Sequence, residues 1–123
     1  GMTPDLLRAF EGAVNAVDVD AAAALVTDDV EVGGPRGAAH GVDVLRQWVA
    51  GSGITLSTVR WFARGDVGVA LQDARWIDDD NTRSVATEFT ARDGRISRIV
   101  RHDDGLDVAL AAAGLSEADE QPL

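Results

Sequence analysis

Residues 54–103 of this 123-residue chain read ITLSTVRWFARGDVGVALQDARWIDDDNTRSVATEFTARDGRISRIVRHD. Apolar and polar residues alternate along this stretch, a pattern typical of β-strands. The alternation is broken at Gly65-Asp66, at residues 78–81 and at Asp93-Gly94. Turns this short join antiparallel strands. The sequence therefore predicts four antiparallel strands, over residues 54–63, 67–77, 83–92 and 95–103.

The residues around this stretch have helical spacing. Thr3-Pro4-Asp5 has the cap, proline and acid of a helix start, and Asp18 can cap a second, shorter helix. A third helix is predicted over 42–50 and a last one over 106–113, with a short strand at 30–32. Helices followed by a run of strands indicate an α+β fold. We expect a cone-shaped half-barrel, a curved antiparallel sheet wrapped around the N-terminal helices. It forms one domain, 1–115, followed by a disordered acidic tail, 116–123.

The composition excludes several classes of function. All 11 basic residues are arginine, and with 21 acidic residues the net charge is −10. Such a charge does not suit nucleic acid or an anionic membrane surface. With no cysteine, two histidines and no glycine-rich phosphate motif, we expect no metal and no cofactor. We expect a cytoplasmic protein.

The order of elements and several local strings resemble the nuclear transport factor 2-like superfamily, and within it the SnoaL-like branch. The strings are FEGAVNAVDVDAAAALVTDD (10–29), GVDVLRQWV (41–49) and DGRISRIVRHDD (93–104). The resemblance implies the cystatin-like cone with a small-molecule pocket, and a homodimer paired through the sheet face. Members include ketosteroid isomerases, epoxide hydrolases, polyketide cyclases and non-catalytic binding domains.

The family's isomerase residues are missing from this chain. Gly34 occupies the position, just before Pro35, where the isomerases have their catalytic base. Their protonated aspartate on the penultimate strand corresponds to a position near Thr87. Their oxyanion-hole tyrosine has no counterpart, because the chain has no tyrosine. Asp73 and Arg75 resemble two members of the Asp–Arg–Asp set of the epoxide hydrolases, and the third position falls at Arg101.

Strand alternation suggests which of these residues face the cone, because residues two apart on a strand share a face. If Val69 and Leu71 point inward, so do Asp73 and Arg75. On the last strand, the inward face is shared by Ile99, Arg101 and Asp103. The candidate catalytic residues are therefore Asp73, Arg75, Arg101 and Asp103. The candidate ligand contacts are Trp48, Trp61, Phe89 and Ile99. The helical spacing of Trp48 favours a core position, and Trp61 would serve equally as core.

Two functions remain open on the sequence alone. The first is a cofactor-independent isomerase, cyclase, hydratase or epoxide hydrolase, with Asp73 as general base and the arginines stabilising negative charge. The second is a non-catalytic dimeric domain that binds a ligand in the cone. A third, weaker possibility is a protein-interaction module whose contacts on the outer sheet face are Trp76, Glu88 and His102.

Overall fold

The computed structural model describes residues 1–123 and contains four helices and one seven-stranded sheet. The helices are α1 (Pro4–Asn15), α2 (Val19–Ala24), α3 (Val42–Gly51) and α4 (Leu106–Ala113). The strands are β1 (Val26–Gly34), β2 (Gly37–His40), β3 (Ile54–Arg64), β4 (Val67–Trp76), β5 (Arg83–Arg92), β6 (Arg95–His102) and β7 (Glu120–Gln121). The α+β prediction is confirmed, and the four long strands lie within two residues of their predicted limits.

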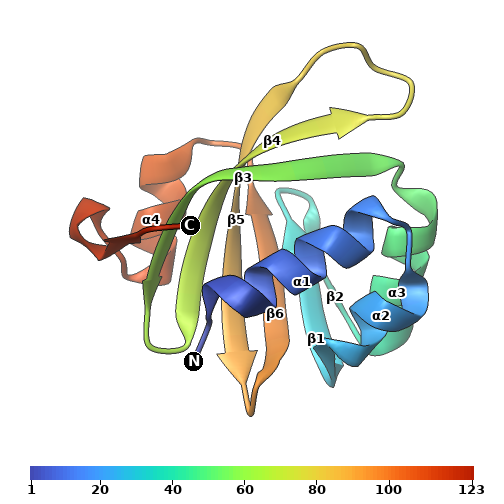
Figure 1. Cartoon of the computed structure of the whole chain (residues 1–123), viewed down its shortest axis with the longest axis horizontal. Coiled ribbons are helices and arrows are strands. Elements are labelled where there is room, and N and C mark those ends of the chain that lie inside the picture. The colour runs from blue at the N-terminus through green and yellow to red at the C-terminus, as the bar shows by residue number, and fades with distance from the viewer.

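The sheet is curved and does not close on itself (Figure 1). Its order is β2-β1-β6-β5-β4-β3-β7, and every pair is antiparallel except β1 with β6. Helices α1, α2 and α3 lie on one side of the sheet, and α4 lies on the other (Figure 1). The parallel pair was not expected. Strand β1, which follows α2, lies second from one edge of the sheet, between β2 and β6.

Most of the core lies between α1, α3 and the concave face of the sheet. Leu7, Phe10 and Val14 of α1 meet Leu45 and Val49 of α3 in a cluster of 20 buried residues. A second, smaller cluster lies under α4, on the convex face of the sheet. No helix combines the length and the apolar character that a membrane span requires. The cytoplasmic location stays a prediction.

Helix α1 is tied to β3 by two polar side chains. The Asn15 amide donates to the Leu56 carbonyl oxygen at 2.8 Å and accepts from the Leu56 N–H at 2.8 Å. Glu11 Oε1 accepts from the Thr58 N–H at 3.0 Å. These bonds satisfy backbone groups on the edge of β3 that faces no strand, so the edge cannot pair with another chain there.

A β-bulge in β3 sets which side chains point inward. The pairing with β4 shifts between Thr58 and Arg60, so Val59 is an extra residue. Ile54 and Leu56 are buried in the concave core before the bulge, and Trp61 takes that position after it. Strict alternation had placed Trp61 on the face of Thr55 and Ser57. That grouping is wrong, because the bulge turns Trp61 to the opposite face.

Trp61 then packs directly on Gly68 of β4. A Cβ on Gly68 would stand 2.1 Å from the Trp61 ring, so no other residue fits there. Trp61 has no exposed surface and meets Phe89 edge-on, with ring centroids 6.4 Å apart. Phe89 in turn meets Phe10 of α1 at 6.0 Å. The contact therefore links β3, β4, β5 and the first helix.

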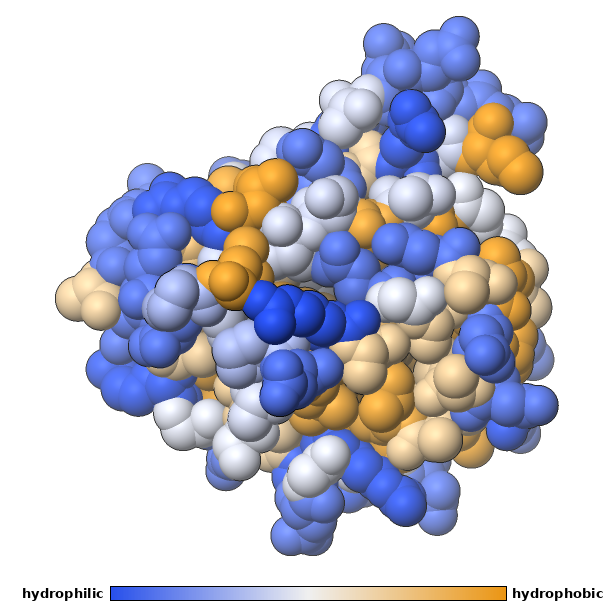
Figure 2. All heavy atoms as spheres, viewed as in Figure 1, coloured by the Kyte–Doolittle hydropathy of each residue, from blue (hydrophilic) through white to orange (hydrophobic).

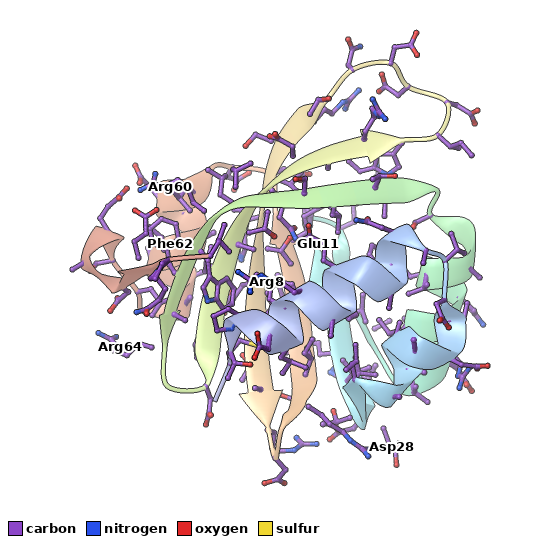
Figure 3. The ribbon with its side chains drawn as sticks, viewed as in Figure 1. Arg8, Glu11, Asp28, Arg60, Phe62 and Arg64 are labelled. Carbon is purple, nitrogen blue, oxygen red and sulfur yellow. The ribbon has the colours of Figure 1, made fainter.

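The C-terminal residues are ordered against β3. Residues 116–123, expected to be a disordered tail, form a 3-10 turn (Glu117–Asp119) and the strand β7, which pairs with Trp61 and Phe62. Arg60 binds Glu120 at 2.7 Å and Glu117 at 2.8 Å, and Arg64 donates to the Gly114 carbonyl oxygen at 2.5 Å. In Figure 3, Arg60 and Arg64 lie beside this segment. The acidic residues fold onto β3 because the bulge turns Arg60 toward them.

Hydrophilic side chains form most of the surface of this C-terminal segment and of the projecting β4–β5 hairpin (Figure 2), although Ile77 and Leu123 are exposed there as well. The hairpin tip contains the acidic run Asp78-Asp79-Asp80, predicted to be a turn. The side chain of Asp79 accepts from the Asn81 N–H at 2.9 Å and from Arg83 at 3.2 Å. These two bonds lower the pKa of Asp79 from its ordinary value, the first contributing most.

We predict that Gly68→Ala strongly destabilises the protein. The new methyl group would overlap the buried Trp61 ring, and overpacking of this kind costs about 1–3 kcal/mol or more. Gly12→Ala is the control, because Gly12 lies on α1 with nothing within 4 Å of an added Cβ. That change should stabilise the helix by about 0.5–1 kcal/mol. Urea unfolding measures the free energy of unfolding of both variants. Equal changes in that free energy for the two variants would contradict the packing of Trp61 on Gly68.

We predict that Arg60→Met releases residues 116–123 from β3. The variant removes the partner of two carboxylates, so the backbone amide hydrogen of Gln121 should exchange with solvent faster. The control variant Arg75→Met, on β4, should leave this exchange rate unchanged. The Arg60 hydrogen bond lowers the pKa of Glu120, so docking is favoured at neutral pH. Docking should weaken as the pH falls below about 4, where a glutamate becomes protonated. Hydrogen exchange that stays the same in Arg60→Met would contradict this attachment.

Candidate functional site

The concave side of the sheet encloses a cavity of about 520 Å³. Helices α1 and α3 form one wall, and β1 and β3 to β6 form the other. Four aromatic side chains line it: Phe10, Trp48, Trp76 and Phe89. Aromatic and aliphatic walls of this kind suit a flat, largely apolar molecule.

The buried end of the cavity carries two polar side chains that do not titrate. Gln72 of β4 is 1% exposed and Thr87 of β5 is 7% exposed. The Thr87 hydroxyl donates to Gln72 Oε1 at 2.7 Å. Behind them Gln72 Nε2 lies 3.4 Å from Glu11 Oε2 and 3.4 Å from Thr58 Oγ1. This end can form hydrogen bonds but has no group of its own that takes up a proton.

The open end of the cavity is charged. Arg101 of β6 and Asp103, the first residue after β6, both line it, with side chains 38% and 51% exposed. Arg101 Nε lies 3.4 Å from Asp103 Oδ1, but Nε is buried and makes no hydrogen bond. The guanidinium lies over Trp76, 5.7 Å from the ring centroid. The Arg101 side chain is therefore partly exposed at the cavity, with Asp103 as its one ion-pair partner.

A turn and a shallower recess extend this open end. The turn from Gly33 to Gly37 between β1 and β2 lines the cavity and brings Arg36 to it. The recess shares Trp76, Val85, Arg101 and Asp103 with the cavity and adds three polar residues of the β4–β5 hairpin: Asp79, Arg83 and Ser84. A ligand longer than the apolar chamber has polar space in which to continue.

Five of the predicted site residues line the cavity: Trp48, Phe89, Ile99, Arg101 and Asp103. Trp61 points inward but is enclosed in the core and does not line the cavity. The predicted placement of Asp73 and Arg75 is wrong. Both are exposed, and Asp73 pairs across the sheet with Ser57 and Ser84, which are exposed as well. Their alternate neighbours Gln72 and Trp76 face the cavity instead.

The wrong placement has a physical cause. Val69 and Leu71 are apolar because α4 covers them on the convex face, not because they face the cone. Both faces of β4 are therefore apolar at this end, and alternation does not distinguish them. The small residues Gly68, Ala70 and Ala74 were the better signal, since they make room for the core. Sequence reasoning missed Gln72, Thr87 and Glu11 as site residues.

The two histidines lie away from the cavity. His102 Nε2 is 3.0 Å from Glu88 Oε1, and Arg98 donates to Glu88 Oε2 at 2.7 Å. Arg98 also donates to Glu31 at 3.1 Å, and His40 lies 3.3 Å from the same carboxylate. Glu88 is 5% exposed although it is on the outer face, so its charge is held by these partners. The homodimer expected through this face stays a prediction. No three acidic or histidine side chains are grouped to hold a metal ion.

The sequence matches the family model described as the SnoaL-like domain over residues 6–99. No curated protein matches it. Among solved structures, it is similar to a protein of unknown function from Cytophaga hutchinsonii described as NTF2-like, at 18% identity. That match covers 81% of this chain and 88% of the other, with a TM-score of 0.74.

Two further structures show the same fold. A protein of Sinorhizobium meliloti, provisionally assigned as a polyketide cyclase, is 23% identical, with 80% of this chain and 94% of that one covered and a TM-score of 0.72. TerC, co-crystallised with polyporic acid, is 18% identical. The match covers 89% of this chain and 95% of TerC, with a TM-score of 0.68. At these identities the likeness concerns the fold alone.

Proposed function

This chain belongs to the SnoaL-like domain family, and we propose that it binds a small, largely apolar organic acid in the cavity of its cone. The observation that carries the proposal is Arg101. It lies at the open end of an apolar cavity of about 520 Å³, with a side chain that is 38% exposed and one ion-pair partner, Asp103, at 3.4 Å. A partly exposed guanidinium can bind a ligand carboxylate through two parallel hydrogen bonds.

The rest of the site fits such a ligand. The aromatic walls match a flat ring system, and Trp76 holds the guanidinium over its face. The ligand would reside in the cytoplasm, where we expect the protein to be.

We predict that 2-naphthoic acid binds and that Arg101→Met weakens it about 10–100-fold, the usual effect of losing a charge-assisted hydrogen bond. Arg95→Met is the matched control, because Arg95 is an exposed arginine on the same strand, far from the cavity. Isothermal titration calorimetry measures all three affinities. Unchanged binding by Arg101→Met, or no binding by the wild-type protein, would contradict the proposal.

A second candidate is proton abstraction next to a carbonyl group, favoured by one observation. Asp103 is the only carboxylate that lines the cavity, and it lies 3.4 Å from Arg101 Nε. Asp103 would remove a proton from carbon, the electron pair would move onto the carbonyl oxygen, and Arg101 would stabilise the resulting enolate. The carboxyl proton then returns to carbon or exchanges with water.

Deuterium exchange into 2-tetralone tests this candidate. If Asp103 acts as the base, the wild-type protein accelerates exchange of the protons beside the carbonyl, and Asp103→Asn lowers that rate about 10²–10⁴-fold. Asp104→Asn is the control, since Asp104 is exposed and does not line the cavity. Proton NMR in D₂O follows the loss of signal. A wild-type rate equal to that of buffer would leave binding as the function.

A further inference from the structure

A chain of four polar residues runs from helix α1 to the buried end of the cavity. Glu11 accepts from the Thr58 backbone N–H at 3.0 Å and also from the Thr58 hydroxyl. Gln72 Nε2 lies 3.4 Å from both Glu11 Oε2 and Thr58 Oγ1. Gln72 Oε1 accepts from the Thr87 hydroxyl at 2.7 Å. Glu11 lies on the side of α1 that faces β3 (Figure 3), and Thr87 lines the cavity.

The direction of these hydrogen bonds is fixed at the Glu11 end. A carboxylate only accepts, so both Thr58 groups must donate to it. The Thr58 hydroxyl has then used its one proton and can only accept from Gln72. The opposite orientation of the Gln72 amide would place its oxygen against two acceptor oxygens. Nε2 therefore faces Glu11, and Oε1 faces Thr87.

This direction determines what the cavity offers a ligand. The Thr87 hydroxyl spends its proton on Gln72, and the two amide protons of Gln72 point to Glu11 and Thr58. Only oxygen lone pairs remain at the buried end. At the open end, Arg101 has only donors. The side of the cavity formed by Gln72 and Thr87 thus offers only acceptors, while Arg101, which lies opposite Thr87 on the neighbouring strand β6, offers donors beside the Asp103 carboxylate.

We propose that the ligand carries a hydrogen-bond donor, such as a phenolic hydroxyl, at its buried end, and that Glu11 is the positioning residue that imposes this requirement. The inference rests on the proposed function, in which Arg101 holds an acidic group at the open end. Glu11 does not line the cavity itself. It acts through the Gln72 amide.

Three related acids test the proposal: 2-naphthoic acid, 6-hydroxy-2-naphthoic acid and 6-methoxy-2-naphthoic acid. The hydroxyl compound should bind the wild-type protein about tenfold more tightly than the other two, the effect of one net hydrogen bond. In Glu11→Gln the Gln72 amide is free to turn, because the new side chain both donates and accepts. The preference of this variant for the hydroxyl compound over the other two acids should therefore fall to about one.

Two further variants make the result specific. Asp5→Asn makes the same charge change on the same helix at an exposed position, and should keep the preference. If Glu11→Gln does not fold, Gln72→Met serves instead. It leaves the Thr87 hydroxyl free to donate, and should likewise remove the preference.

The outcomes separate the two proposals. If none of the three acids binds, both the proposed function and this inference are overturned. If 2-naphthoic acid binds but the wild-type protein does not prefer the hydroxyl compound, this inference alone is overturned. A preference that survives in both Glu11→Gln and Gln72→Met would remove the positioning role of Glu11.

Discussion

The rest of the structure depends on the contact between the Trp61 ring and the bare Cα of Gly68. A Cβ at Gly68 would stand 2.1 Å from the ring, so the two strands can approach in this register only with glycine there. Because Gly68 faces the core, every second residue after it along β4 faces the same way. Gln72 and Trp76 are thereby turned to the cavity, and Asp73 and Arg75 to the outside. This one packing contact in the core therefore determines which side chains of β4 face the cavity.

The bulge at Val59 makes that contact possible and has a second effect. It turns Trp61 inward and Arg60 outward, where Arg60 holds Glu117 and Glu120. The same irregularity therefore builds the core and attaches the C-terminal segment to the edge of β3. Thr58, the last inward residue before the bulge, joins Glu11 to Gln72. Residues 58–61 of β3 therefore take part in three features: the core contact of Trp61, the attachment of the C-terminal segment, and the chain of polar side chains from Glu11 to Thr87.

The sequence predicted the fold well and the site only in part, for reasons visible in single residues. The turns at Gly65-Asp66 and Asp93-Gly94 are local signals, and the strands they join were placed correctly. Arg101 was placed at the cavity correctly because β6 continues its alternation from Ile99, and Asp103, just after the end of β6, lines the cavity as well. Asp73 was misplaced because α4, distant in sequence, makes the outer face of β4 apolar. The order of residues 116–123 depends on Arg60, about sixty positions earlier in the chain, and no local pattern contains that partner.

The net charge of −10 and the proposed acidic ligand are compatible because the relevant charges are local. At physiological salt the field of a distant surface charge is screened over about 8 Å, so the overall charge slows the approach of an anion more than it weakens its binding. Most of the arginines already hold an acidic side chain, as Arg60, Arg92 and Arg98 do. Arg101 differs because its acid, Asp103, lies beside it without a hydrogen bond to Nε. An arginine that is only partly paired, in a protein whose net charge is negative, can bind an anion selectively. The surrounding negative charge disfavours anions over most of the surface, while Trp76 and the apolar walls suit a ligand with a flat, apolar body.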